Sequence, residues 1–168
     1  MALRDRSDAA QLLAELRRRT WTVGTAESLT GGLVAAAIID VPGASSSMRG
    51  GVIAYDMRVK RELLGVDGDL LAAHGAVHAD VARQMSEGVR RALRVDGRDA
   101  DVGLATTGIA GPESPDGQPV GLVHLGVTTP AGYWGRKQIY MGTRDEIRRR
   151  TVDGVIALAL NALAAARE

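Results

Sequence analysis

The sequence predicts an α/β protein, a three-layer α/β/α single domain with a mixed sheet that spans residues 1–168. Two observations predict this fold class. Short apolar and β-branched runs alternate with longer runs that carry apolar residues at helical spacing, which is typical of strands separated by helices. Toward the end of the chain two strand-like runs follow each other directly and a long helix closes the chain, which indicates a hairpin added to the sheet.

The first half of the chain predicts two strands among helices. Asp56 can cap the helix that follows the second strand, and Gly65 can end it. A small-residue loop is expected over 44–48, after a Pro-Gly pair that ends the preceding helix. In order, the elements are a helix over 8–19, a strand over 22–26, a helix over 31–39, a strand over 50–55 and a helix over 57–64.

The second half predicts two more helical segments, a third strand and then the hairpin. Glycine and proline mark the loop over 108–119, which separates the third strand from the hairpin. In order, the elements are helical segments over 69–74 and 80–93, strands over 101–107, 120–128 and 133–141, and a final helix from about 144 to 166.

Composition excludes several classes of function. The net charge is +1, from 21 basic and 20 acidic residues, so no bulk field attracts nucleic acid. The chain has no Phe and few other aromatic residues, which argues against a base-stacking platform. It has no Cys, so disulfides, thiolate catalysis and cysteine metal sites are excluded.

The charge and hydropathy pattern predicts a soluble, cytoplasmic protein with no membrane partner. The first 19 residues are charged and helix-patterned, unlike a secretory signal. The most apolar runs, 33–39 and 155–166, are too short to span a bilayer. Compact domains often form symmetric assemblies, so a homo-oligomer is one expectation for its partners.

The first candidate site is the turn that reads Glu27-Ser28-Leu29-Thr30-Gly31, between a predicted strand and a predicted helix. The free N–H groups of a helix's first turn favour negative charge. A serine nucleophile needs such donors, because the carbonyl oxygen that it attacks becomes an oxyanion. Ser28 is therefore a candidate nucleophile. The alternative is that Ser28 or Thr30 only caps the helix.

Two further segments follow predicted strands, and binding clefts of open α/β sheets form where strands end. Tyr55 and Lys60 lie in the first, and the second reads Thr-Thr-Gly-Ile-Ala-Gly-Pro over 106–112. Each has an ordinary explanation as well. Tyr55 could place its hydroxyl in water, Lys60 could be a solvated helix residue, and the glycine run could be a tight turn.

Several separate motifs, in the same order, resemble the CinA C-terminal domain family. They are TAESLTGG at 25–32, GVIAY at 51–55, KRELLGV at 60–66, TGIAGP at 107–112 and PVG at 119–121. The resemblance covers the chain from about residue 8 to residue 165. The larger N-terminal domain of many relatives is not in this sequence, so the chain resembles the stand-alone form of the family.

The resemblance implies an α/β/α fold and the activity of the family's characterised enzymes, which are nicotinamide mononucleotide amidohydrolases (nicotinamide-nucleotide deamidases). These enzymes use a serine, a lysine and a tyrosine and need no metal or cofactor. Carried over, Ser28 is the nucleophile, Lys60 the base and Tyr55 a helper, and the expected partner is a small-molecule nucleotide. Substrate contacts are expected from Glu27, Thr30, Gly31, Gly32, Thr107, Gly108, Ala110 and Gly111.

The implied chemistry sets a physical requirement on Lys60. A serine hydroxyl is too weakly acidic to attack an amide at neutral pH without a neighbouring base. A lysine can act as that base only when it is neutral, which requires its pKa to fall toward roughly 7 or 8. We expect burial in the cleft, and the N-terminal end of the helix that Asp56 opens, to lower the pKa of Lys60.

The chain departs from the family pattern at two places. Leu29 stands where relatives commonly have cysteine, and we expect this change to be harmless. The loop after Gly111-Pro112 reads Glu113-Ser114-Pro115-Asp116-Gly117 where relatives are usually glycine-rich. Two carboxylates near a substrate phosphate could weaken binding or alter substrate choice.

A rival hypothesis is a catalytically silent domain that binds a nucleotide or a protein partner. The trio of Ser28, Tyr55 and Lys60 argues against it, since binding alone does not need these residues. His74 and His78 are four apart, as metal ligands on a helix can be, but no third ligand is evident and no metal site is expected.

Two other features have ordinary explanations. His124 falls inside a predicted strand and is expected to pack there. The basic triplet at 148–150 is expected to be a solvated helix face, although one of its arginines could reach a substrate phosphate.

Overall fold

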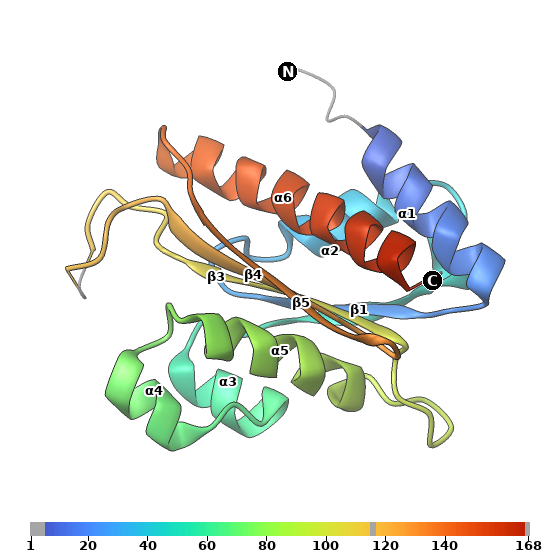
Figure 1. Ribbon diagram of the computed structural model, residues 1–168, viewed down its shortest axis with the longest axis horizontal. Helices are drawn as coiled ribbons and strands as arrows, with labels where there is room; N and C mark the ends of the chain where they lie inside the picture. The colour runs from blue at the N-terminus through green and yellow to red at the C-terminus, as the bar shows by residue number, and fades with distance from the viewer. Residues whose placement is uncertain (1–5, 115–116, 167–168) are drawn as a thin grey trace.

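The computed structural model describes residues 6–114 and 117–166 and confirms the predicted fold class. Figure 1 shows three layers, with one sheet in the middle. Helices α1, α2 and α6 cover one face of the sheet, and α3, α4 and α5 cover the other (Figure 1). Within the described residues no helix is long and apolar enough to cross a membrane.

The sheet has five strands in the order β2-β1-β3-β4-β5. β1 pairs in parallel with both β2 and β3, whereas β3, β4 and β5 pair antiparallel, so the sheet is mixed. The central strands β1 and β4 are buried along their whole length, as expected of strands covered on both faces. The bounds are β1 Val23–Glu27, β2 Met48–Ile53, β3 Val102–Gly108, β4 Leu122–Thr129 and β5 Gly132–Ile139.

The helices agree closely with the predicted ones. Helix α3 has the predicted bounds, because Asp56 caps its first turn and Gly65, in the left-handed conformation, ends it. The helices are α1 Arg6–Arg19, α2 Leu33–Ile39, α3 Met57–Leu64, α4 Gly68–His74, α5 Ala79–Ala92 and α6 Arg144–Ala165.

The expected loop over 44–48 is instead a short 3₁₀ turn followed by the start of a strand. The turn η1 covers Ala44–Ser46, and β2 begins at Met48, two residues earlier than predicted. Met48 pairs with Val23 across a shift in register, so this pairing extends the strand. The early start depends on a tertiary contact that the local pattern does not carry.

Close backbone packing joins helices α3 and α5 on one face of the sheet. Gly88 on α5 faces the backbone of Leu64 at the end of α3, and a Cβ at position 88 would overlap the Leu64 carbonyl oxygen. Helix α3 therefore lies directly on α5, which in turn packs on the sheet. This contact fixes α3, and with it Lys60, relative to the strands.

Candidate active site

The candidate site lies where β1, β2 and β3 end at the same edge of the sheet. Ser28 directly follows β1, and its backbone N–H donates to the Thr106 carbonyl of β3 at 3.0 Å. On the other side, the Ala54 N–H donates to the Glu27 carbonyl at 2.8 Å. Hydrogen bonds to both neighbouring strands therefore hold the first residues of the turn in place.

Lys60 and Ser28, 32 residues apart in the chain, are in direct contact. Lys60 Nζ lies 3.0 Å from Ser28 Oγ. It also donates to the carbonyl oxygens of Ala54, at 2.6 Å, and Tyr55, at 3.2 Å. The Lys60 residue is 0% exposed and Ser28 is 8% exposed, so the contact is shielded from bulk water.

Burial lowers the pKa of Lys60 from its ordinary 10.5 to about 8, because a charged amine loses its hydration. The Asp56 carboxylate opposes this shift and raises the pKa, but burial outweighs it. The direction agrees with the expected one. A neutral amine has two N–H groups and one lone pair. With the N–H groups on the two carbonyls, the lone pair is left for the Ser28 hydroxyl proton.

Local sequence explains why the Lys60 amine reaches this point. Asp56 accepts a hydrogen bond from the Arg58 backbone N–H at 2.7 Å and so starts α3 directly after the end of β2. Lys60 is the fourth residue of this helix, on the side that faces the sheet edge. Its long apolar stem can then be buried while the amine meets the two carbonyls.

Glu27 was expected to contact the substrate, but in the structure it contacts the start of α2. Its side chain is buried, and its carboxylate accepts hydrogen bonds from three backbone N–H groups at the start of α2. These are the N–H groups of Gly32 at 2.9 Å, Val34 at 3.0 Å and Ala35 at 2.8 Å. Glu27 thus supplies the anion that the helix N-terminus favours. The alternative of a Ser28 or Thr30 cap is wrong, because the N-cap residue is Gly32.

The backbone N–H groups of the two glycines in the turn already have acceptors. The Gly31 N–H donates to the Ser28 carbonyl at 3.1 Å and the Gly32 N–H to Glu27, so neither is free for a substrate oxygen. Within the described residues no acceptor is found for the backbone N–H groups of Leu29 and Thr30. Those two N–H groups are the donors that the turn leaves available next to Ser28.

Thr106 and Arg148 make contacts with the turn that the sequence did not predict. The hydroxyls of Thr30 and Thr106 are 2.8 Å apart in a buried contact. Arg148 on α6 donates to the carbonyl oxygens of Leu29, at 2.8 Å, and Thr30, at 3.2 Å. Arg148 is 118 residues from Thr30 in the chain, and no local pattern signals this contact.

Tyr55 contributes its backbone to the site. Its carbonyl accepts from Lys60, while the residue as a whole is 64% exposed. Within the described residues the Tyr55 hydroxyl has no hydrogen bond to Ser28 or Lys60. Its expected role as a helper therefore stays a proposal.

The Gly-Ile-Ala-Gly segment begins at the last residue of β3, two residues after the Thr106 carbonyl that accepts from Ser28. The Thr107 hydroxyl donates to the Ala76 carbonyl at 2.7 Å. At Gly108 a Cβ would crowd the backbone of β4, and Ala110 is buried. The Gly111 carbonyl accepts from Arg144 of α6 at 2.7 Å.

The acidic loop that follows is described only in part. Glu113 is exposed, and Asp116 lies outside the described residues.

The histidines have structural partners. His78 is the N-cap residue of α5 and accepts from the Asp80 backbone N–H, and its ring stacks on that of His74, with centroids 4.6 Å apart. His124 is buried in β4, and burial lowers its pKa. In the part of the chain that the structure describes, no three side chains of metal-binding type are grouped together.

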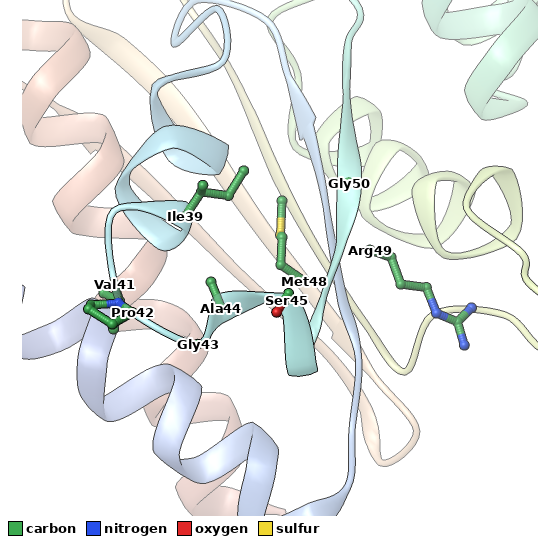
Figure 2. A pocket seen from close by; sticks show the side chains of 9 residues that line it. All are labelled: Ile39, Val41, Pro42, Gly43, Ala44, Ser45, Met48, Arg49 and Gly50. Atoms are coloured by element: carbon green, nitrogen blue, oxygen red, sulfur yellow. The ribbon is translucent and has the colours of Figure 1, made fainter.

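A separate hollow lies near the start of β2, at the opposite end of this strand from the candidate site. It has a volume of about 450 Å³ and lies between the end of α2 and the start of β2. Figure 2 shows Ile39 and Met48 on its walls, whereas the Arg49 side chain is directed away from it. The Arg49 guanidinium donates to the carbonyls of Leu93 and Arg98, so it places no charge in the hollow.

A family model for the CinA C-terminal domain matches residues 5–163, nearly the whole chain. The chain belongs to this family. A CinA-like protein of Frankia casuarinae is 44% identical to it over 153 residues, which cover 91% of this chain and 34% of that protein. A CinA-like protein of an Anaeromyxobacter species is 46% identical over 142 residues, 83% of this chain and 33% of that protein. The chain thus spans about a third of the length of these relatives.

Solved structures of CinA-type proteins have the same fold over nearly their whole length. Competence/damage inducible protein CihA from Agrobacterium tumefaciens matches with a TM-score of 0.88 and 34% identity, covering 98% of this chain and 99% of that one. A competence damage-inducible protein A from Klebsiella pneumoniae matches with the same TM-score and 29% identity, covering 95% and 96%. These names describe a competence- or damage-inducible type of protein and state no reaction.

Proposed function

We propose that this CinA-family protein is an amidohydrolase that converts nicotinamide mononucleotide and water to nicotinic acid mononucleotide and ammonia. The observation that carries the proposal is the buried contact of 3.0 Å between Lys60 Nζ and Ser28 Oγ. A lysine with a pKa of about 8 is neutral in a useful fraction of molecules near neutral pH and can accept a proton. A purely structural contact has no need of a buried amine beside a hydroxyl.

The proposed reaction begins when Ser28 Oγ transfers its proton to Lys60 Nζ and attacks the carboxamide carbon. The carbonyl oxygen becomes an oxyanion, for which the N–H groups of Leu29 and Thr30 are the available donors. The C–N bond then breaks, and the leaving nitrogen takes the proton from Lys60 and departs as ammonia. Water, deprotonated by the neutral Lys60, hydrolyses the acyl-Ser28 ester, and the proton returns to Ser28.

The choice of substrate is supported by the family resemblance and by the shape of the chain around the turn. Thr107, Gly108, Ala110 and Gly111 run along the same edge of the sheet as Ser28, where a mononucleotide could lie. Tyr55 is 64% exposed and follows the carbonyls that Lys60 contacts, and its side chain is proposed to contact a bound substrate. Glu27 acts through the turn in this proposal and does not contact the substrate.

The direct test is incubation of the purified protein with nicotinamide mononucleotide, with ammonia and nicotinic acid mononucleotide measured together. We expect both products in equal amounts, and no products from Ser28→Ala. Ser45→Ala is a matched control, because Ser45 is exposed on the 3₁₀ turn far from Lys60, and it should keep wild-type turnover. A protein that binds the mononucleotide and releases no ammonia would instead support the silent binding module.

A further inference from the structure

Arg148 holds the nucleophile turn from a distant part of the chain. It lies in the second turn of α6, next to Ile147, which is buried in the core. Its Nε donates to the Leu29 carbonyl at 2.8 Å and its Nη2 to the Thr30 carbonyl at 3.2 Å. One planar guanidinium therefore spans two consecutive carbonyl groups of the turn, a geometry that the rigid fork of arginine allows.

These contacts fix the orientation of two peptide planes. In a planar trans peptide the C=O and the following N–H point in opposite directions. Because Arg148 holds the Leu29 carbonyl, the Thr30 N–H must face away from Arg148. The plane after Thr30 is fixed as well, since its carbonyl accepts from Arg148 and from the Leu33 N–H, and the Gly31 N–H donates to Ser28.

We infer that Arg148 is a positioning residue that keeps the Thr30 backbone N–H directed toward the place where the substrate oxyanion forms beside Ser28. This inference rests on the proposed serine chemistry. Without Arg148 the Leu29–Thr30 peptide can rotate, and the donor is no longer preorganised, which is the property that gives oxyanion stabilisation its strength.

The neighbouring arginines make different contacts and supply a control. Arg149 forms an ion pair with Asp145 at 2.9 Å on the exposed face of α6. Arg150 donates to the Met141 carbonyl. Within the described residues neither arginine has a hydrogen bond or ion pair with the turn. Arg149→Met therefore removes the same charge from the adjacent position while leaving the Leu29 and Thr30 carbonyls with their partner.

The test uses a neutral fluorophosphonate that carries no mononucleotide phosphate. Ser28 Oγ forms a bond to phosphorus, the P–F bond breaks and fluoride leaves, with the serine proton accepted by Lys60. The phosphoryl oxygen takes the place of the oxyanion. We expect Arg148→Met to slow this labelling by at least about tenfold, since loss of an oxyanion donor costs roughly 10²–10³ in rate. Arg149→Met should label at the wild-type rate.

The dependence of labelling on pH separates positioning from general damage. In Arg148→Met the midpoint should stay that of the wild type, because Lys60 lies in α3 and its two carbonyls lie in the short segment between β2 and α3, away from Arg148. Arg148→Lys can reach one carbonyl at a time and should label at an intermediate rate. If Arg148→Met does not fold, the folded Arg148→Lys variant carries the test, and its labelling must be slower than that of Arg149→Met.

Three results are decisive. Wild-type labelling in a folded Arg148 variant overturns the inference, and an accompanying rise in KM for the mononucleotide would assign Arg148 to the substrate phosphate instead. A wild-type protein that is never labelled overturns the serine chemistry and the inference together. Labelling that depends on Arg148 in a protein that does not deamidate the mononucleotide supports the inference and overturns only the proposed substrate.

Discussion

Burial of the Lys60 amine has two consequences, one for the stability of the fold and one for the proposed chemistry. Taking its amine out of water disfavours the charged form, and its pKa falls from 10.5 to about 8. The folded protein therefore holds a cation below pH 8 that it would be more stable without. The same shift makes the amine a base in the pH range where a serine needs one.

The first prediction concerns the stability of Lys60→Met. Between pH 8 and 10.5 the unfolded wild-type chain binds a proton at Lys60 that the folded chain does not, so the free energy of unfolding rises with pH. Over that window the wild type should gain about 3 kcal/mol relative to Lys60→Met, at 1.36 kcal/mol per pKa unit. Denaturant unfolding of both proteins at pH 8 and 10.5 measures this difference. Parallel pH dependence in the two proteins would contradict it.

Ser28 and Lys60 could be predicted from the sequence, because each follows a strand end and matches a family motif. The role of Glu27 could not. Its place in the sequence is next to the nucleophile, which suggests substrate contact, but its carboxylate is drawn to the unpaired N–H groups of α2. Which of two nearby partners an acidic side chain takes depends on its rotamer, and sequence spacing does not fix that.

Among the helices, α2 depends on a buried carboxylate, because the backbone N–H groups at its start donate to Glu27. Glu27→Gln keeps one acceptor oxygen but places an NH₂ group against backbone donors, so at least one buried donor loses its partner. We expect a loss of about 2 kcal/mol in the free energy of unfolding and a lower kcat, since hydrogen bonds to charged groups contribute roughly 1.5–3 kcal/mol. Glu62→Gln, on the exposed face of α3, is the control. Equal unfolding free energies for the two variants would refute this role for Glu27.

A substitution at Gly88 tests the contact between α3 and α5. Gly88→Ala adds a methyl group against the Leu64 backbone, which cannot move aside without displacing α3. We expect a loss of about 1–3 kcal/mol in stability, as for other overpacked sites, and a lower kcat because Lys60 moves with α3. In the control Gly68→Ala the new methyl group meets only the flexible Arg61 side chain. Thermal unfolding and turnover of both variants measure this effect. A Gly88→Ala protein that is as stable and as active as Gly68→Ala would contradict the predicted clash between α3 and α5.

The elements themselves were predictable where local signals are strong. Asp56 and Gly65 bracket α3, and its bounds in the structure are the predicted ones. The start of β2 was not predictable, because Met48 becomes a strand residue only by pairing with Val23. Local capping signals act within one turn, whereas strand ends depend on the partner strand.

The whole molecule brings four distant segments to one edge of the sheet. The turn after β1 carries Ser28, α3 carries Lys60, β3 supplies Thr106, and α6 supplies Arg148. Motifs in the sequence identified the first two. The third and fourth contacts appear only when the chain is folded, since Arg148 is 119 residues from Leu29.

A prediction at this scale concerns metal dependence. Ser28 and Lys60 supply the nucleophile and the base, so deamidation should survive exhaustive chelation with unchanged kcat. Activity is measured before and after dialysis against a chelator, with each divalent cation then added back. Loss of activity that zinc restores would instead point to a metal-dependent reaction and to the histidines.

The most direct test of the account is the pH dependence of kcat/KM in two variants of Lys60. If the neutral amine takes the serine proton, the wild-type value rises with pH through about 8. Lys60→Arg keeps the positive charge but cannot lose its proton at working pH, so it should be nearly as inactive as Lys60→Met. An active Lys60→Arg enzyme with a wild-type pH profile would contradict the assignment of Lys60 as the base.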